Sequence, residues 1–335
     1  MKLFILPPLS VLYGAVTRTR LSLYRRGTFQ STKLDRPVIS VGNITAGGTG
    51  KTPLVEWVAR KVAATGKKVC ILTRGYGRVH PERLVVVSDG ADVMATPSEA
   101  GDEPFLLATN LRGVAAVISN ADRVAAANEA IRQFDTECFV LDDGFQHLRL
   151  ARDLNIVTID ATNPWGGGRL LPYGLLREPL GGLSRADVIV ITRTDQVNDI
   201  DDLRDEISRI TRDAPIFRSR MRISRTTSLN DSAEVLQPPV AAFCAVGNPR
   251  AFFNQLTYKV VYEKAFADHH RYSQSEIDSL IADALRAGAN SLVTTAKDAV
   301  KLRSLSFEMP CYVVEIEPHI ENEPELIGLI RSVLR

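Results

Sequence analysis

The chain of 335 residues lacks the features that mark several classes of protein. It contains only four cysteines (Cys70, Cys138, Cys244 and Cys311), and none of them forms C-x-x-C or pairs with a histidine at zinc spacing. Each lies in or beside an apolar run, so we expect four buried, reduced thiols, as in cytosolic proteins. The 41 basic and 39 acidic residues nearly cancel, which excludes a polycation that binds nucleic acid by charge, and no nucleic-acid partner is expected.

The first 34 residues contain no acidic side chain. Their apolar stretch, Leu3–Val16, includes Pro7 and Pro8 and is shorter than the roughly 20 residues that a membrane span requires. The helical spacing i, i+3, i+4, i+7 is filled by Leu9, Leu12, Tyr13 and Val16. Four basic residues follow, Arg18, Arg20, Arg25 and Arg26. An amphipathic helix is therefore predicted, which either lies in a membrane interface or packs on the protein's own core.

Strand and helix patterns alternate over the first two thirds of the chain. A β-branched run at 35–42, a Gly-rich loop, a helical pattern at 51–64 and an apolar run at 69–73 form one βαβ unit. Further strands are expected at 84–87, 114–119, 138–141, 155–159 and 188–192, with helices at 98–110, 122–134 and 201–212. This alternation predicts an α/β fold with a parallel sheet covered on both faces.

Residues 216–236 interrupt this pattern because they are rich in Arg, Ser and Thr and have no helical period. We interpret them as an extended connector or a hairpin. Strands at 240–246, 259–266, 291–295 and 312–316 and helices at 250–256, 274–286 and 324–334 follow. The predicted division is an N-terminal helix at 1–30, a P-loop domain at 31–215, a connector at 216–238 and a smaller α/β domain at 239–335.

The strongest motif is a phosphate-binding loop between the first strand and the first helix of the βαβ unit. Gly50-Lys51-Thr52 supplies the second half of G-x-x-x-x-G-K-[ST], while Thr45 stands where the first glycine is usual. In this pattern the lysine reaches the β- and γ-phosphates and the hydroxyl binds Mg²⁺. The expected phosphate-binding residues are Thr45, Ala46, Gly47, Gly48, Thr49, Gly50, Lys51 and Thr52. The alternative, a Gly-rich turn without a ligand, is disfavoured by the strand before it and the helix after it.

A second motif is the apolar strand that ends in Asp142 and Asp143. In P-loop proteins a carboxylate at a strand end helps to hold Mg²⁺ or its waters. We therefore expect Mg²⁺ to be held by Thr52 and one of these two aspartates, and the sequence leaves open which of them contacts the metal.

Taken together, the motifs resemble one kinase family over nearly the whole chain. They are Gly42–Pro53, Thr73–Gly77, Gly101–Pro104, Asp142–His147, Leu170–Pro172, Leu176–Pro179 and Asp268-His269. This set, in this order, is similar to the tetraacyldisaccharide 4′-kinase family. The resemblance implies ATP-dependent transfer of the γ-phosphate to the 4′-hydroxyl of an acylated glucosamine disaccharide 1-phosphate in lipid A biosynthesis. It also implies a β-ribbon connector and a peripheral position at the cytoplasmic face of the inner membrane.

The resemblance also implies roles for individual residues. Asp102 is the candidate base, with His269 as its partner and Lys51 on the transferred phosphate. Without the resemblance, the sequence favours a helix N-terminal charge for Asp102 and a solvated loop for His269 and its competitor His270. The candidates for substrate phosphate are Arg74, Arg123 and Arg177, each of which could instead form a surface ion pair. Lys297 and Asp298 match a family motif whose role stays open.

Two other classes share a similar loop. A GTP-hydrolysing metallochaperone requires a guanine-reading Asn-Lys-x-Asp, whereas the nearest segment here is Thr192-Arg-Thr-Asp195. A partition ATPase requires an additional lysine before Gly47, and that position is Ala46. Both classes are therefore disfavoured, and a comparison of ATP with GTP, with and without an acylated disaccharide, would separate all three.

Overall fold

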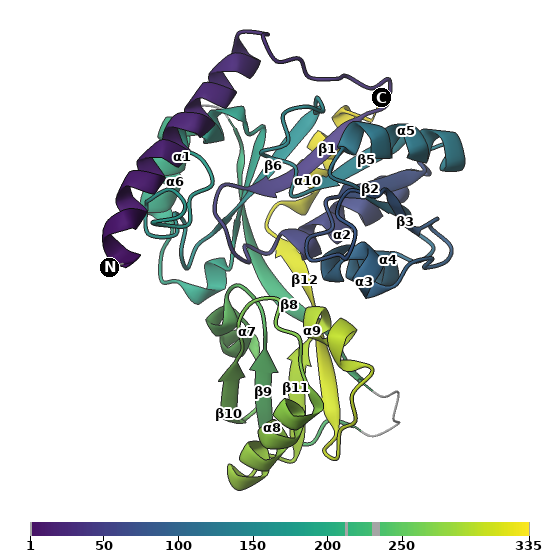
Figure 1. Ribbon diagram of the computed structural model, residues 1–335, viewed down its shortest axis with the longest axis vertical. Helices are drawn as coiled ribbons and strands as arrows, with labels where there is room; N and C mark the ends of the chain where they lie inside the picture. The colour runs from purple at the N-terminus through teal and green to yellow at the C-terminus, as the bar shows by residue number, and fades with distance from the viewer. Residues whose placement is uncertain (1, 212–213, 230–234, 335) are drawn as a thin grey trace.

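The computed structural model describes residues 2–211, 214–229 and 235–334, and for residues 2–5 the backbone alone. One sheet of 12 strands passes through the molecule in the order β10-β9-β11-β12-β8-β7-β6-β1-β5-β2-β4-β3. Figure 1 shows a larger unit above a smaller one, with the long strands β8 and β12 running between them. The α/β fold class predicted from the alternating pattern is confirmed.

The larger unit has a mainly parallel sheet. Its strands are β1 (Val38–Asn43), β2 (Val69–Thr73), β3 (Val85–Ser88), β4 (Ala115–Ser119), β5 (Cys138–Asp142), β6 (Leu154–Asp160) and β7 (Val188–Thr192). β3 alone in this group pairs antiparallel, with β4 at the sheet edge. The helices are α2 (Lys51–Ala63), α3 (Pro97–Ala100), α4 (Asp102–Asn110), α5 (Arg123–Phe134) and α6 (Asp201–Thr211), with 3₁₀ turns η1 (Leu180–Arg185) and η2 (Thr194–Gln196). The single helix expected at 98–110 is two helices, because Gly101, with φ 93°, separates α3 from α4.

Two layers of apolar side chains cover the faces of this sheet. On β1, Ile39 packs into the same cluster as Leu54 and Val58 of α2, whereas Val38 packs with Ala126 of α5 on the opposite face. All these side chains are buried, and burial of one aliphatic side chain stabilises the fold by roughly 1.5–3 kcal/mol. The β-branched, uninterrupted runs of the strands are explained by this burial on both faces.

The smaller unit repeats the two-sided arrangement on a shorter sheet. It contains β9 (Val240–Cys244), α7 (Pro249–Gln255), β10 (Val260–Ala265), α8 (Gln274–Arg286), β11 (Ser291–Thr295) and α9 (Ala296–Leu302). α8 begins with a capping box formed by Ser273 and Glu276. α9 was not predicted. The four cysteines of the chain are free and buried, as expected.

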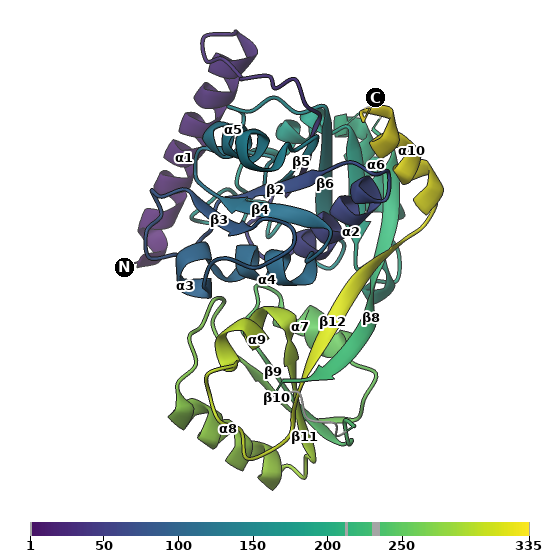
Figure 2. The same ribbon diagram turned by 90° about the vertical axis from the view of Figure 1, so that its right-hand side faces the viewer.

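The connector forms a two-stranded ribbon with a distant partner. β8 (Ile216–Ser228) pairs antiparallel with β12 (Cys311–Ile320), and the register runs from Tyr312 opposite Ser228 to Ile320 opposite Ser219. The hairpin considered for 216–236 is therefore wrong for the described part, because the second strand comes from the end of the chain. Residues 230–234 of the expected connector lie outside the described residues. Figure 2 shows β8 and β12 side by side along their length.

The last helix, α10 (Glu323–Ser332), belongs to the larger unit. Leu326 and Ile330 lie in the core cluster that contains the apolar side of α2, and Lys61 of α2 pairs with Glu323 at 2.6 Å. The placement of all of 239–335 in the smaller domain is therefore wrong for this helix. The reason is that β12 leads the chain back across the ribbon before α10 begins (Figure 2). The other boundaries of the division stay predictions.

α1 (Lys2–Arg25) lies along the outside of the larger unit (Figure 1). It contacts the protein through small and polar groups: the Ser10 hydroxyl donates to the Leu170 carbonyl at 2.8 Å and Tyr13 donates to the Arg177 carbonyl at 2.8 Å. The apolar residues Leu9, Val11, Leu12 and Val16 are exposed. In the described part of the chain, no helix is both long enough and apolar enough to cross a membrane.

Candidate active site

The phosphate loop links the buried end of β1 to the start of α2. Gly47, at φ 112°, and Gly50, at φ 79°, take backbone conformations that side chains rarely adopt. Gly50 is the residue that caps α2, so the helix begins at Lys51, and the free N–H groups of its first turn face the loop. Residues 46–52 all line one large cavity, whereas Thr45 is buried and its backbone bridges to Leu176. The loop predicted from Gly50-Lys51-Thr52 thus has the strand, turn and helix that the motif requires.

Lys51 is held by two groups at the mouth of this loop. Its Nζ donates to Asn43 Oδ1 at 2.9 Å and lies 3.0 Å from Asp143 Oδ1. Asp143 also accepts a hydrogen bond from Arg177 Nη1 at 2.6 Å. Although burial alone would raise it, the two cations hold the pKa of Asp143 well below its usual range. An ammonium so placed is available to exchange its carboxylate for a phosphate oxygen.

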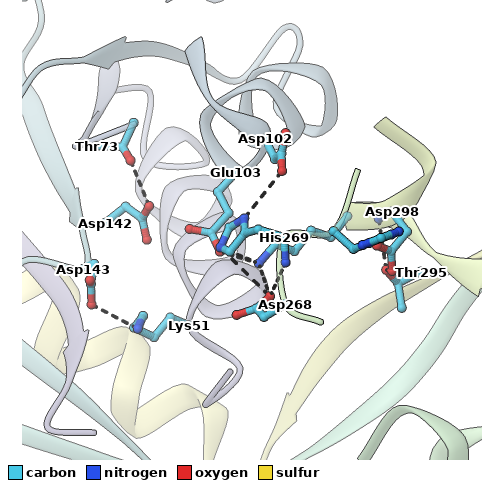
Figure 3. A network of polar contacts seen from close by, with 12 residues as sticks. Lys51, Thr73, Asp102, Glu103, Asp142, Asp143, Asp268, His269, Thr295 and Asp298 are labelled. Atoms are coloured by element: carbon cyan, nitrogen blue, oxygen red, sulfur yellow. Dashed lines mark hydrogen bonds and ion pairs between the residues drawn. The ribbon is translucent and has the colours of Figure 1, made fainter. Parts of the chain in front are cut away.

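The neighbouring carboxyl has the opposite character. Asp142 ends β5, is buried, and accepts a hydrogen bond from the Thr73 hydroxyl at 3.0 Å (Figure 3). Burial first, then the nearby Glu103 and Asp143, raise the pKa of Asp142 to about 7. Asp143 follows in the left-handed region at φ 52°, so the two carboxyl groups diverge from the strand end. The two predicted metal partners are therefore adjacent, and the sequence could not show that their charges differ.

These groups fit Mg²⁺. The metal is usually bound by one or two carboxylates together with water and substrate phosphates, and not by a closed protein cage. Asp142 and Asp143 would supply the carboxylates and Thr52 the hydroxyl. In the described part of the chain no cluster of three or more His, Cys, Asp or Glu forms such a cage. A cation here would also favour the charged form of Asp142, whose buried carboxyl otherwise ionises only near pH 7.

The candidate base lies where the two units meet. Asp102 is the first residue of α4 in the larger unit, and its Oδ2 lies 3.5 Å from His269 Nδ1 of the smaller unit (Figure 3). His269 adopts φ 60° in the loop after β10, and its ring nitrogen Nε2 lies 3.3 Å from Lys297 Nζ. The competing His270 contacts Glu276 at 3.1 Å instead. The carboxylate–imidazole pair expected from Asp102 and His269 is present, and its proton-transfer role stays a prediction.

Charged groups from three elements surround this pair. Lys297 on α9 lies 3.1 Å from Glu103 and 3.3 Å from Asp268, and these two carboxylates, which outweigh burial, raise the pKa of Lys297. Figure 3 shows Glu103, Asp268 and His269 pointing toward one another. The ion pairs join α4 of the larger unit to the smaller one. The sequence does not assign a role to Lys297. The structure places its ammonium beside His269, the partner of the candidate base.

The three candidate arginines all line the same cavity, which has a volume of about 1470 Å³. Arg74 is exposed and donates to the Tyr76 hydroxyl at 3.1 Å, while Arg177 is tied to Asp143. Arg123 is only 3% exposed, yet its Nε has no partner among the described groups, and burial lowers its pKa. A buried cation with an unused N–H group beside a cavity suits an anionic ligand. The structure brings all three together, and their substrate stays to be tested.

Several residues of the site were not predicted. One is Asn43, which orients Lys51, and another is Glu103, which pairs with Lys297. Both lie inside the sequence motifs, but the sequence assigns roles only to neighbouring residues of these motifs. Arg193 forms an ion pair with Asp160, which also accepts a hydrogen bond from Asn248 at 3.1 Å. The Arg193–Asp160 pair lies at the end of β7, in the segment 192–195 that stands nearest to a guanine-reading Asn-Lys-x-Asp motif. The contacts of Glu103, Arg193 and Asn248 have no local sequence signal, because each partner is distant along the chain. Asn43 lies only eight residues before Lys51, within the same motif, and could have been found there.

Comparisons with known proteins agree over the full length. The family model described as LpxK, Tetraacyldisaccharide-1-P 4'-kinase, matches residues 2–335. The Tetraacyldisaccharide 4'-kinase of Geobacter sulfurreducens is 41% identical over 336 residues, covering 97% of this chain and 92% of the relative. The protein of the same name from Geobacter metallireducens is 42% identical, covering 90% and 88%.

A solved structure supports the same conclusion. The crystal structure of LpxK from Aquifex aeolicus in complex with ATP matches with a TM-score of 0.76 and 31% identity, over 98% of each chain. The motif set, the geometry of the loop and these similarities lead to one identification: the chain belongs to the LpxK family of tetraacyldisaccharide-1-P 4'-kinases and is a phosphotransferase.

Proposed function

We propose that this protein transfers the γ-phosphate of ATP to the 4′-hydroxyl of tetraacyldisaccharide 1-phosphate, forming the 1,4′-bisphosphorylated precursor of lipid A. The observation that carries the proposal is a single cavity lined by the phosphate loop, by the three arginines and by His269. The relatives' names and the ATP-bound family structure support the nucleotide and the acceptor.

The chemistry follows from the placement of charge. Phosphoryl transfer requires positioning and neutralisation of charge more than covalent help. Lys51 and the loop amides hold the triphosphate, while Mg²⁺ bound at Thr52 and the Asp142–Asp143 pair would supply charge neutralisation. Asp102, oriented by His269, accepts the proton of the attacking hydroxyl. Arg74, Arg123 and Arg177 bind phosphate on the substrate by charge-assisted hydrogen bonds.

The acceptor is an acylated lipid, so we also propose that the protein works peripherally at the cytoplasmic face of the inner membrane. The support is α1, whose outer side carries Leu9, Val11, Leu12 and Val16, with exposed fractions of 45, 68, 62 and 60%. Tyr13, Val16 and Arg20 of the same helix also line the cavity. A lipid held in the interface would therefore be delivered beside the phosphate loop.

The test is a direct assay of transfer. Purified protein is mixed with Mg²⁺, ATP or GTP, and tetraacyldisaccharide 1-phosphate in mixed micelles, and the product is analysed by mass spectrometry and by NMR at the 4′ position. We expect one added phosphate at O4′ with ATP and little with GTP. Lys51→Met should lower kcat about 100-fold or more, because the ammonium stabilises charge that develops during transfer.

Lys61→Met is the matched control. Lys61 lies on the same helix, pairs with Glu323 at the surface and does not line the cavity, so kcat should stay at the wild-type value. Absence of an added phosphate with either nucleotide would refute the proposed function. Normal turnover by a folded Lys51→Met variant would remove the assigned role of the loop lysine.

A further inference from the structure

α9 presents two lysines to the larger unit. Lys297 and Lys301 are four residues apart on this helix, so they project from the same side, and α9 packs against α4. Lys297 pairs with Glu103, the second residue of α4. Lys301 is not a residue that the family motifs single out, and the proposed function does not use it.

Lys301 lies between two carboxylates. Its Nζ is 3.5 Å from Asp102 Oδ2 and 3.8 Å from Asp298 Oδ1, and it donates a hydrogen bond to the His270 carbonyl at 3.1 Å. The side chain is only 8% exposed. A nearly buried ammonium requires such partners, because an unpaired charge at this depth is strongly destabilising.

Asp298 is the second carboxylate that contacts Lys301. It is fully buried, and its carboxylate accepts hydrogen bonds from the Ala245 amide at 3.0 Å, the Thr295 hydroxyl at 2.7 Å and the Tyr272 hydroxyl at 3.1 Å. Figure 3 shows the Thr295–Asp298 pair next to the cluster around His269. With three donors from three segments, Asp298 has no freedom to turn. It therefore acts as a rigid anchor within the smaller unit.

We propose that Lys301, anchored by Asp298, is a positioning residue that holds the Asp102 carboxylate in place against His269. The inference rests on the proposed function, since it assigns the positioning of the base that the transfer requires. It also gives the segment Thr294–Asp298 a role in the structure: it carries the anchor and begins the helix on which Lys301 lies. Asp102 then has both of its contacts, with His269 and Lys301, only when the smaller unit packs against α4.

The electrostatics agree with this geometry. Burial would raise the pKa of Asp102, but the hydrogen bond from His269 and the charge of Lys301 outweigh it, so the pKa is lowered. The other charged groups that face this carboxylate region are Glu103 on α4, Asp268 and His269 on the loop after β10, and Lys297 and Asp298 on α9. Without Lys301, Asp102 keeps His269 as its ion-pair partner among the described residues and gains freedom to rotate.

The experiment compares the full-length wild type with Lys301→Met, Lys301→Arg and the control Lys264→Met in the transfer assay. Lys264 is an exposed lysine of the same unit whose Nζ lies over the Phe266 ring, 5.9 Å from the ring centroid. We expect Lys301→Met to lower kcat about 10- to 100-fold while the KM for ATP stays within about twofold, because Lys301 does not line the cavity. Lys301→Arg should restore part of kcat, and Lys264→Met should match the wild type.

A double variant tests the mechanism itself. If Lys301 acts through the base, Lys301→Met added to Asp102→Asn should cause little further loss of kcat. Independent, multiplicative losses would overturn the proposal, as would an unchanged kcat in Lys301→Met. A loss explained wholly by a higher KM for ATP, together with a lower melting temperature, would show a merely structural lysine and also overturn it. An inactive wild type would instead refute the proposed function, so the two failures are distinguishable.

Discussion

Asp142 and Asp143 are consecutive in the chain, but their environments separate their ionisation. Asp143 lies between Lys51 and Arg177, which stabilise its charge. For Asp142, burial and the charge of Glu103 outweigh the charge of Lys51 and the hydrogen bond from Thr73. A nucleotide that draws Lys51 away from Asp143 would leave this carboxylate less compensated. We infer that the pair is arranged for a cation that enters together with phosphate, which is how Mg²⁺ is usually held.

Glu56 is an acidic side chain that lines the cavity, and burial disfavours its charged form. It lies on α2 and accepts a hydrogen bond from Asn110 Nδ2 at 2.9 Å. Burial outweighs that bond and the charge of Arg60 and raises the pKa of Glu56 to about 7. Between about pH 4.5 and pH 7 the folded protein therefore retains a proton that the unfolded chain has lost. The contribution of Glu56 to stability is present below this window and is lost as the pH rises through 7.

We therefore predict that Glu56→Gln is more stable than the wild type at pH 8, by on the order of 1–3 kcal/mol, and nearly equal to it at pH 4.5. Glutamine keeps an acceptor for Asn110 and has no charge to bury. Thermal unfolding at the two pH values measures the difference, with Glu308→Gln at an exposed position as the control. A stability difference that is the same at both pH values would show that Glu56 titrates normally.

At the scale of elements, short-range patterns predicted most of the fold. The positions of β2, β7, α8 and β11 agree with the expected ranges, because apolar period and capping are local signals. α9 was missed because it has only seven residues and follows β11 directly, with Thr295 both ending the strand and capping the helix. The partner of β8 was also missed, because a ladder between residues near 220 and 318 leaves no trace in either segment.

The same limit applies to the site. The phosphate loop and the carboxylates at the end of β5 were found because each is a compact motif. Asp102 and His269 required a family resemblance, since they are 167 residues apart and meet only through the docking of the two units. No sequence motif pointed to Lys301 as a residue of the site. Its proposed positioning role depends on the distance to Asp102, which only the folded chain determines.

α1 carries a prediction at the scale of a single helix. Val11 and Leu12 are exposed, do not line the cavity and lie away from the contacts of Ser10 and Tyr13 with the protein. We predict that Val11→Ser combined with Leu12→Ser weakens binding to anionic liposomes by about 100-fold, since each buried apolar side chain contributes about 1.5 kcal/mol and about 1.4 kcal/mol is a factor of ten. Liposome sedimentation measures the change.

The matched control is Val79→Ser combined with Met94→Ser. Both residues have the same exposed fraction, 62%, and lie on the surface of the larger unit outside α1. Equal losses of liposome binding in both pairs would show nonspecific adsorption. Unchanged binding in the α1 pair would contradict the interfacial role of the helix.

At the scale of the whole molecule, the site is divided between two units that the ribbon of β8 and β12 joins (Figure 2). The larger unit supplies Lys51 and Asp102, and the smaller one supplies His269. Lys297 bridges the two through Glu103, and Asn248 does so through Asp160. The proposed function therefore requires the smaller unit to be seated closely, and the backbones of the two units come close together at the phosphate loop itself.

Gly247 is the residue of the smaller unit whose backbone lies against the phosphate loop. A Cβ atom at this position would lie 2.7 Å from the Gly48 amide nitrogen and 3.2 Å from Gly47 Cα, both of them backbone atoms. We predict that Gly247→Ala moves the smaller unit off the loop and lowers kcat by about 10- to 100-fold, because misplacement by about 1 Å has effects of this size. The melting temperature should change little, since each unit keeps its own core. Gly328→Ala in α10, where a Cβ meets nothing within 4 Å, should retain full activity. Wild-type turnover by Gly247→Ala would show that close seating of the smaller unit on the loop is not needed for transfer.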